Sequence, residues 1–579
     1  MNDLEKLRHS AAHVMADAVK RLWPDAKLTI GPPIDTGFYY DFDVEHHFSD
    51  EDLGKLETLM AEIVGADLPF KEQEITREQA IDYFQKRNEP YKVELAQAIP
   101  EGERITLHSH GEFVDLCRGG HVKSTGEIKA FKLLSVAGAY WRGDSKNKML
   151  QRIYGTAFAD KKLLAEYLKQ REEAEKRDHR KLGKELGLFA FHPLAPGSAF
   201  WMPKGTVLYT TLQEFMRRLL LDDAGYVEVK TPLLYHQALW EQSGHWQHYA
   251  DNMFKIVAED QNFGLKPMNC PSHYLMYNME LHSYRELPLR IHSQDILHRN
   301  EASGTLSGLT RTRQFQQDDA HIFLRLDQVE AEVTSLLALV NKVYAVFGMQ
   351  TTFQLSTRNP EKMMGALEDW DKAEQSLASA LTKNNIAFDT VPNEAAFYGP
   401  KIDINVTDAL GRKWQCATIQ LDWNAPERFD LTYVGEDNAR HRPIVIHRAI
   451  FGSFERFIAI LVEHYAGAFP VWLAPVQARA VVVSEKQEAF ARNVAAKLKS
   501  RGIRVDLDLS NDKLGAKIRR AQLEKIPYML VIGDKEVAAG TVAPRLRDGK
   551  QLEPMSVDAL ADRLSEEGQL PLYSPAQRN

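Results

Sequence analysis

Two short polar motifs near the start of the chain combine residue types that move protons or bind metal ions. The sequence HSAAH places His9 and His13 four residues apart, and DLCRGGH contributes Asp115, Cys117 and His121. On a helix, side chains four residues apart lie on one face. We predict that the two HSAAH histidines point roughly opposite the apolar stripe of the same segment and are not core histidines. The plain alternative is a solvated polar face.

A second group of candidates is cationic. The sequence HRNE contains Arg299 and Glu301, and the later segment IHRAIFGSFERFIAIL contains Gly452 and Arg456. A guanidinium offers paired donors and keeps its proton, so it suits the negative charge that builds on a phosphate under attack. An isolated R-N-E is better explained as a surface ion pair, but the order and spacing of three such segments favour a phosphate site.

The composition limits the class of protein. Of the 579 residues, 44% are hydrophobic, which is enough for three or four domain cores. Only three cysteines are present, which excludes a disulfide scaffold and suits a reducing compartment. The formal net charge of -8 counts mildly against a nucleic-acid binder, although a local basic stripe can still follow phosphates. Without an apolar run of about 18 residues or a signal-like N-terminus, we expect a cytoplasmic protein.

The elements that position these residues fall into four segments. Residues 3–22 carry a helical apolar stripe, and the highly charged residues 160–186 predict one long, largely exposed helix between two domains. Within residues 187–470, short strand-like runs often follow one another directly, which favours an antiparallel sheet with helices packed on it. Residues 474–579 predict a small βαβ-type domain. The stripe consists of Leu4, Leu7, Ala11, Met15, Ala18 and Leu22.

Three segments of the largest region resemble motifs 1, 2 and 3 of the class II aminoacyl-tRNA synthetases. They are GYVEVKTPLL, a long strand ending near Pro232; HRNEASGTLSGLTRTRQFQQDDAHIF, two strand-like runs joined by a polar loop; and IHRAIFGSFERFIAIL, a strand leading into a helix that carries Gly452 and Arg456. The resemblance implies an α+β multidomain protein with an antiparallel central sheet. It also implies that motif 1 helps to form a homodimer and that motifs 2 and 3 hold ATP with Mg²⁺.

The same resemblance gives roles to residues around ATP. Arg299 would contact the α-phosphate, Arg456 would stack on adenine and reach the terminal phosphate, and Glu301 would read the adenine amino edge. Arg311 and Lys401 are further phosphate candidates. The predicted catalytic residues are Arg299, Lys401 and Arg456.

Other segments resemble the threonyl-tRNA synthetases in particular. KPMNCPSH, QQDDAHIF and VIHRAIFG supply Cys270, His321 and His447, which match the positions at which that family binds one Zn²⁺. Without these motifs, a lone cysteine and two distant histidines are better explained as buried structural residues. Zn²⁺ with three protein ligands keeps an open position, which the amino and hydroxyl groups of L-threonine can fill and valine cannot. By resemblance, the amino acid is held by Gln317, Asp319 and Tyr398.

Serine keeps both groups and lacks only a methyl, worth about 1–3 kcal/mol of discrimination, so a second, hydrolytic site is expected. HSAAH with DLCRGGH resembles the editing domains of threonyl- and alanyl-tRNA synthetases, which implies hydrolysis of Ser-tRNA(Thr). The cluster could bind a metal, as in the alanyl relatives, but the resemblance to threonyl enzymes favours hydrolysis without one. Whether His9, Cys117 or the tRNA ribose activates the water stays open. The predicted editing residues are His9, His13, Lys92, Asp115, Cys117 and His121.

The C-terminal segment resembles the class II anticodon-binding domain through LGAKIRRAQLEKIPYMLVIGDKEV, and Glu536 and Arg545 fall where family members contact anticodon bases. The expected partners are tRNA(Thr), ATP, L-threonine and a second copy of the chain. Many bacterial members have a ubiquitin-like domain before HSAAH, so either this branch lacks it or the chain is truncated. The predicted domains are editing at 1–159, a linker helix at 160–186, catalysis at 187–472 and anticodon binding at 473–579.

Two rival interpretations remain. Prolyl and seryl synthetases share the three motifs but do not need the zinc and editing residues together. A catalytically inactive relative that only binds tRNA would usually lose Arg299, Arg456 or a zinc ligand, and all of these are present.

Overall fold

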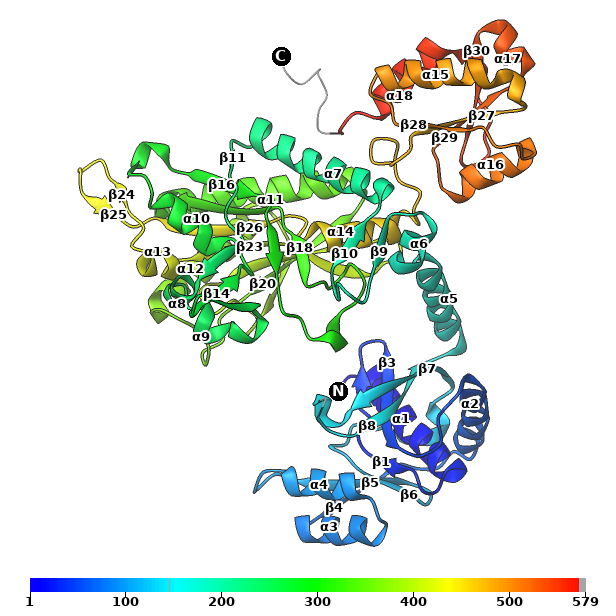
Figure 1. The fold of residues 1–579 in the computed structure, drawn as a ribbon. Helices are drawn as coiled ribbons and strands as arrows, with labels where there is room; N and C mark the ends of the chain where they lie inside the picture. Colours follow the sequence, from blue (N-terminus) through cyan, green and yellow to red (C-terminus); the bar gives the residue numbers. More distant parts are fainter. Residues whose placement is uncertain (145, 572–579) are drawn as a thin grey trace. The chain divides into compact units, whose positions relative to one another are not determined.

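The chain forms two units that divide between Glu172 and Glu173 in a computed structural model, which describes residues 1–144 and 146–571 (Figure 1). The C-terminal end of the predicted anticodon-binding segment, residues 572–579, lies outside the described residues. Among the described helices, none is long and apolar enough to cross a lipid bilayer. The domain boundaries drawn from the sequence stay predictions.

The N-terminal unit is built around helix α1 (Asp3–Leu22), which the apolar stripe predicts. Asn2 and Glu5 form a capping box at its start, which satisfies two backbone N–H groups. The helix packs on α2 and on a five-stranded sheet, and the other polar motif begins in the last strand of a separate three-stranded sheet and continues after it. The elements are α2 (Asp50–Gly65), β3 (Gly37–Asp43), β7 (Ala130–Tyr140) and β8 (Met149–Phe158), then β4 (Lys71–Ile75), β5 (Ile105–His110), β6 (Phe113–Leu116), α3 (Arg77–Lys86) and α4 (Pro90–Ala98).

Helix α1 is buried almost all round, and this corrects the predicted setting of its histidines. Residues 7–19 are all buried, whereas Leu4, at the start of the stripe, is 37% exposed. His9 and His13 retain only 7% and 1% exposure. The sequence predicted that these histidines are not core residues and left a solvated face as the alternative, but the ring of His121 from the DLCRGGH segment covers that face.

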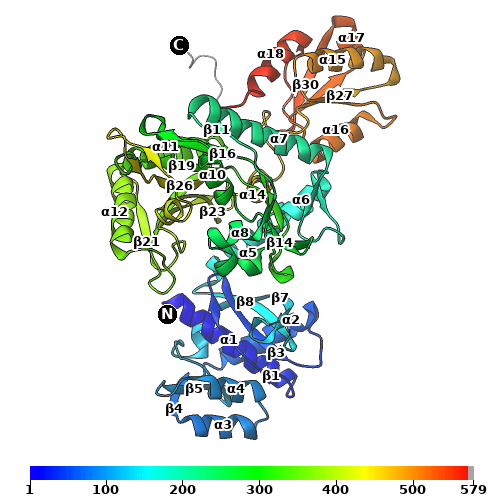
Figure 2. The ribbon, with the colours of Figure 1, turned by 60° about the vertical axis from the view of Figure 1, so that its left-hand side comes forward.

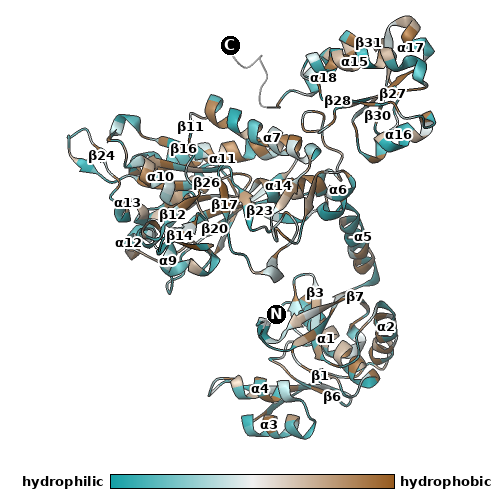
Figure 3. Cartoon of the chain, in the orientation of Figure 1, coloured by the Kyte–Doolittle hydropathy of each residue, from teal (hydrophilic) through white to brown (hydrophobic). Residues whose placement is uncertain are grey.

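Residues 160–186 form two helices, where the sequence predicted one. Helix α5 (Lys161–Arg177) has no buried residue and is mostly hydrophilic, as predicted (Figure 3). Helix α6 (His179–Glu185) is different, because it packs on α14 (Phe454–His464) and buries His179. The break falls at Asp178, whose carboxylate accepts the Arg180 N–H as an N-cap, a contact that stops the preceding helix and starts a new one.

The central domain holds an eight-stranded sheet, which is largely antiparallel as the sequence predicts (Figures 1 and 2). Its order is β11-β16-β19-β26-β23-β22-β20-β21, and only the outermost pair at each edge is parallel. Helices α11 (Val329–Val346), α12 (Leu367–Lys383) and α14 share the largest apolar core with its strands. The strands are β11 (Val227–Glu228), β16 (Leu289–Ser293), β19 (Asp319–Leu324), β20 (Gln350–Ser356), β21 (Phe388–Val391), β22 (Lys401–Thr407), β23 (Lys413–Asp422) and β26 (Ile444–Ala449).

Two details of the motifs differ from the prediction. GYVEVKTPLL is not a long strand: only the two residues of β11 belong to the sheet, and Pro232, which lacks an N–H, follows in an irregular stretch. Gly452 does not lie on the motif 3 helix but in the turn before it, with a φ of 77°. This left-handed conformation favours glycine, and a Cβ there would lie 2.9 Å from the Cys416 carbonyl oxygen.

The C-terminal domain confirms the predicted βαβ pattern. Three parallel strands are extended by two antiparallel ones in the order β28-β27-β29-β30-β31. Its elements are β27 (Ala478–Val482), α15 (Glu488–Ser500), β28 (Val505–Asp508), α16 (Leu514–Leu523), β29 (Tyr528–Ile532), α17 (Asp534–Ala539), β30 (Thr541–Leu546), β31 (Met555–Ser556) and α18 (Val557–Glu567).

Candidate active sites

The central domain contains a cavity of about 430 Å³ that brings the predicted phosphate-binding residues together. It lies between the hairpin of β17 (Ile296–His298) and β18 (Gln314–Gln316), the strands β22 and β23, and the start of α14. Four cationic and two acidic side chains from distant parts of the sequence therefore face one space. The lining includes Arg299, Glu301, Arg311, Gln317, Lys401 and Arg456.

Local contacts hold these cations in place. Arg299 donates from Nε to the Pro267 carbonyl at 3.3 Å, Glu301 pairs with Arg311 at 2.8 Å, and Lys401 pairs with Asp403 at 2.7 Å. Among the described residues, the buried Nε of Arg456 has no hydrogen-bond partner. Buried donors are normally satisfied, so an unpaired one beside a cavity suits an anionic ligand.

Three potential metal ligands meet beside the sheet. Strands β19 and β26 pair in a register that sets His321 directly opposite His447, and Cys270 at the start of α10 (Cys270–Tyr277) completes the group. The His447 Nδ1 lies 3.1 Å from the His321 Nε2 and 3.4 Å from the Cys270 Sγ. Tetrahedral zinc at usual bond lengths separates two nitrogens by about 3.3 Å and a nitrogen from a sulfur by about 3.6 Å. The donor types and spacing therefore fit one zinc ion.

Residues behind these ligands orient them, and the sequence did not identify them. The His447 Nε2 lies 3.0 Å from both the Asp422 carboxylate and the Tyr274 hydroxyl, and the His321 Nδ1 lies 2.8 Å from the His273 Nδ1. Burial alone would lower the pKa of His447, but the nearby Cys270 and Asp422 groups raise it to about 10. Such outer contacts fix the imidazole orientation and strengthen a ligand.

Of the three predicted amino-acid residues, Asp319 and Tyr398 lie beside this cluster and Gln317 lines the cationic cavity. Asp319 is two residues before His321 on β19 and so projects from the same face, where it accepts from Asn269 Nδ2 at 3.0 Å. The Tyr398 ring stacks on His447 with centroids 5.1 Å apart. Its hydroxyl donates to Gln420 Oε1 at 2.5 Å, and Gln420 lines the cationic cavity. One side chain thus connects the metal cluster with the phosphate site.

In the N-terminal unit, the two polar motifs form one cluster. Ligand atoms of His9, His13, Cys117 and His121 all lie within 4.8 Å of one another. The Cys117 Sγ is 3.2 Å from the His121 Nε2, and the His9 and His121 rings stack with centroids 4.3 Å apart. Burial raises the pKa of Cys117 to about 12 and, with a contribution from His9, lowers the pKa of His121 to about 2. The cluster is therefore uncharged near neutral pH.

A buried ion pair lies behind this cluster. Lys92 and Asp115 retain 2% and 1% exposure and form a direct salt bridge. Asp115 also accepts from the Tyr40 hydroxyl at 2.7 Å and lies 3.6 Å from the His13 Nε2. Tyr40 was missed by the sequence analysis, because a tyrosine in a β-strand is normally a packing residue. The buried Nδ1 atoms of His9 and His13 have no hydrogen-bond partner among the described residues.

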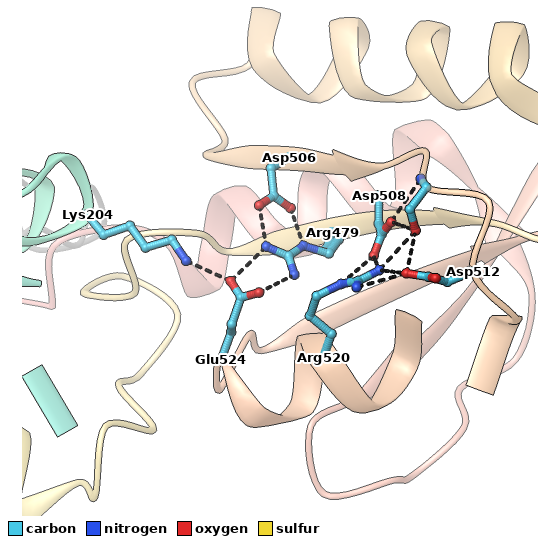
Figure 4. Close-up of polar contacts among 8 residues, drawn as sticks. Lys204, Arg479, Asp506, Asp508, Asp512, Arg520 and Glu524 are labelled. Carbon is cyan, nitrogen blue, oxygen red and sulfur yellow. Dashed lines mark hydrogen bonds and ion pairs between the residues drawn. The ribbon is translucent and has the colours of Figure 1, made fainter. Parts of the chain in front are cut away.

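The anticodon candidates lie in the C-terminal domain. Glu536 is on α17, where its carboxylate accepts the Gly533 N–H at 2.8 Å, and Arg545 is on β30. Figure 4 shows that two other arginines of this domain are already paired. Arg520 pairs with Asp508 and Asp512, and Arg479 pairs with Asp506 and Glu524. Glu524 also pairs with Lys204 of α7 (Pro203–Arg218), 2.7 Å away.

Comparisons with known proteins agree with this arrangement. Residues 254–465 match the tRNA synthetase class II core domain (G, H, P, S and T), residues 471–567 match the anticodon binding domain, and residues 105–154 match the threonyl and alanyl tRNA synthetase second additional domain. A threonine–tRNA ligase of Anaeromyxobacter dehalogenans (strain 2CP-C) is 56% identical over 98% of this chain and 89% of its own length. That of Acetivibrio thermocellus is 54% identical over 96% and 88%.

A solved structure is also similar. The RNA binding domain of threonyl-tRNA synthetase from Cryptosporidium parvum Iowa II superposes with a TM-score of 0.67 and 43% sequence identity. The match covers 69% of this chain and all of that one.

The three cysteines allow a direct test of the metal cluster. We expect one zinc ion per purified chain, and Cys270→Ser should lower its affinity because a hydroxyl is a poor substitute for a thiolate. Cys416→Ser, which removes a buried thiol outside both clusters, is the matched control, and Cys117→Ser tests the N-terminal cluster. Metal content by elemental analysis should fall only in the first variant. Full zinc in Cys270→Ser would contradict the assignment.

Proposed function

The chain belongs to the threonyl-tRNA synthetase family, and we propose that it activates L-threonine with ATP, transfers it to tRNA(Thr) and hydrolyses Ser-tRNA(Thr) formed in error. One observation carries the synthetic part of this proposal. A single side chain, Tyr398, connects the cluster of Cys270, His321 and His447 with a cavity that arginines line. An amino acid held at the first place would have its carboxylate next to a phosphate held at the second.

In the proposed activation step, the carboxylate of threonine attacks the α-phosphate of ATP and pyrophosphate leaves. Arg299, fixed by its contact with the Pro267 carbonyl, would stabilise the negative charge that develops at phosphorus. Arg456, Arg311 and Lys401 would hold the nucleotide from other walls of the cavity. Members of this family generally use Mg²⁺ with ATP, and the ion would arrive with the phosphates.

Selection of the amino acid would depend on its hydroxyl group. A zinc ion at the cluster would supply an open position for the amino and hydroxyl groups. Asp319, which already accepts one hydrogen bond in a nearly buried place, would accept the substrate hydroxyl. Valine would leave this carboxylate without its partner, and an unpaired buried acceptor costs about 1–3 kcal/mol or more when charged. Gln317 and Tyr398 would complete the pocket.

The N-terminal cluster is the proposed editing site. Its uncharged imidazoles can accept hydrogen bonds from a water molecule, and the Lys92–Asp115 pair holds the adjacent charge fixed. We assign the hydrolysis to water without a metal. Serine would fit between these side chains, whereas the methyl of threonine would occupy the place of the attacking water. The domain limits would be those drawn from the sequence, with editing at 1–159.

Partners follow from the same family assignment. The C-terminal domain is of the tRNA-binding type, and Glu536 and Arg545 are its proposed contacts to anticodon bases. A homodimer through motif 1 is supported by exposed apolar side chains there, since Val227, Leu233 and Leu234 are 49%, 39% and 44% exposed. We propose the cytoplasm as the place of action.

The proposed activity is tested by ATP–pyrophosphate exchange with each amino acid in turn. Threonine should support exchange, serine should support it at about 1 part in 10–200, and valine should support less, because only the first two carry a hydroxyl. Exchange driven best by proline, or by any other amino acid than threonine, would contradict the assignment.

Arg299→Ala should slow adenylate formation far more than it unfolds the protein. Loss of one donor fixed toward a developing charge costs on the order of 10²–10³ in rate. The control is Arg325→Ala, which removes a guanidinium of the same domain that pairs with Asp327 outside the cavity. Exchange rates and melting temperatures of both variants are the measurements. Near-normal exchange in folded Arg299→Ala would overturn its assignment.

Joint replacement of His9, His13 and Cys117 by Ala should leave threonine activation nearly intact, because none of them lies in the central domain. The variant should fail to hydrolyse preformed Ser-tRNA(Thr) and should accumulate it when given serine. His47→Ala, which changes an exposed histidine of the same unit, is the control. Equal deacylation by wild type and triple variant would place the site elsewhere, and inhibition by a chelator would show that the site needs a metal.

A further inference from the structure

His179 occupies an unusual place at the start of α6. Its side chain is buried, with 3% exposure for the residue, and both ring nitrogens have partners. The Nε2 accepts the backbone N–H of Leu309 at 3.1 Å. A backbone N–H can only donate, so the Nδ1 carries the proton and donates to Glu463 at 2.7 Å. The neutral ring thus has no lone pair left for a metal ion, although Asp178 and Glu463 lie close by.

Leu309 belongs to the turn that closes the motif 2 loop. The Ser307 N–H donates to the Arg311 carbonyl at 3.2 Å and the Thr310 N–H donates to the Ser307 carbonyl at 2.9 Å, so the turn is tight. Thr310 and Arg311, the next two residues, line the ATP cavity. The Leu309 side chain is 1% exposed in the main apolar core. The His179 imidazole therefore holds the backbone immediately before a predicted phosphate ligand.

The neighbouring glycine shows how closely the loop lies against the ring. Gly308 has a φ of 51°, and a Cβ built on it would lie 2.2 Å from the His179 Nε2. Such an approach is possible only without a side chain, and the left-handed conformation favours glycine as well. Two independent features of the loop therefore fit this imidazole: the hydrogen bond from the Leu309 N–H, and the absence of a side chain at Gly308.

The other partner of His179 connects it to the opposite wall of the cavity. Glu463 is near the C-terminal end of α14, and the same helix carries Arg456 in its first turn. Glu463 also accepts the His179 backbone N–H at 3.1 Å. One side chain therefore joins the turn that precedes Arg311 to the helix that presents Arg456.

We propose that His179 is a positioning residue for ATP, which sets the spacing between the motif 2 turn and the motif 3 helix. The inference rests on the proposed synthetase function and adds a residue outside the three motifs. Without the imidazole, the buried Leu309 N–H loses its acceptor, and an unsatisfied buried donor is costly enough to displace the turn. Arg311 and Thr310 would then move away from the nucleotide. The amino-acid pocket is built from other elements and would keep its form.

The test compares His179→Gln with His179→Asn. The oxygen of glutamine reaches about the place of Nε2 and keeps the bond to Leu309, whereas asparagine replaces Nδ1 and keeps only the bond to Glu463. We expect His179→Asn and His179→Ala to raise the KM for ATP on the order of tenfold, which corresponds to one lost buried hydrogen bond. The KM for threonine should stay within about twofold, and His179→Gln should be close to wild type, because the backbone N–H of residue 179 still donates to Glu463.

Direct ATP binding by calorimetry separates this inference from the proposed function. If wild type shows no threonine-dependent exchange, the function fails, while the ATP affinities of the Gln and Asn variants still decide the role of His179. Equal ATP affinity in these two variants would overturn the inference, as would a parallel rise in both KM values. The comparison of the Gln and Asn variants decides the role of His179 even if His179→Ala does not fold.

A double-mutant cycle gives a second measurement. Gly308→Ala should weaken ATP binding in the wild type because its Cβ meets the imidazole, and the loss should be smaller in the His179→Ala background, where that atom is gone. Additive losses would show that the loop does not depend on the ring.

Discussion

The register between β19 and β26 is the constraint on which the central domain depends. It sets His321 opposite His447 and leaves Asp319 on the same face two residues away. A slip of β19 by one residue would turn His321 and Asp319 to the other face of the sheet, away from His447. The other face also requires this register, because Asp318 and Arg448 form an ion pair there with 0% side-chain exposure. Each face thus fixes the register that the other requires.

The buried ion pair also shapes the motif 3 turn. Burial raises the pKa of Asp318 to about 7, while Arg448 and the N–H groups of Ile450 and Phe451 oppose that rise. The two N–H groups donate to its carboxylate at 2.7 and 2.9 Å. This cap bends the chain after β26 into Gly452 and so directs Arg456 into the cavity. The strands that bring the candidate metal ligands together therefore also orient Arg456.

The sequence predicted what local patterns can encode. HSAAH, HRNE and the strand runs led to the correct fold class, and the cationic and histidine groups each meet in space. Asp422, Tyr274 and Gln420 were not identified, because they approach the site through strand pairing and packing between segments far apart in the chain. His273 could have been found, since it lies three residues after Cys270 and hence on the same face of a helix. The burial of His9 was not predicted for the same reason, because the residues that cover a helix face come from elsewhere in the chain.

The two proposed sites would select by different properties of the amino acid, its hydroxyl group in one and its size in the other. This explains why one pocket would not suffice. The central pocket would favour amino acids that carry a hydroxyl, because Asp319 and a metal ion would each bind it. Serine meets that requirement as well as threonine does. Only size separates these two, and a pocket that holds the larger substrate cannot exclude the smaller. The N-terminal cluster can select by size in the opposite direction. A site closed by packed rings, such as His9 on His121, can admit serine and exclude threonine, which is larger by one methyl. Discrimination by chemistry and discrimination by volume then act in sequence on the same amino acid.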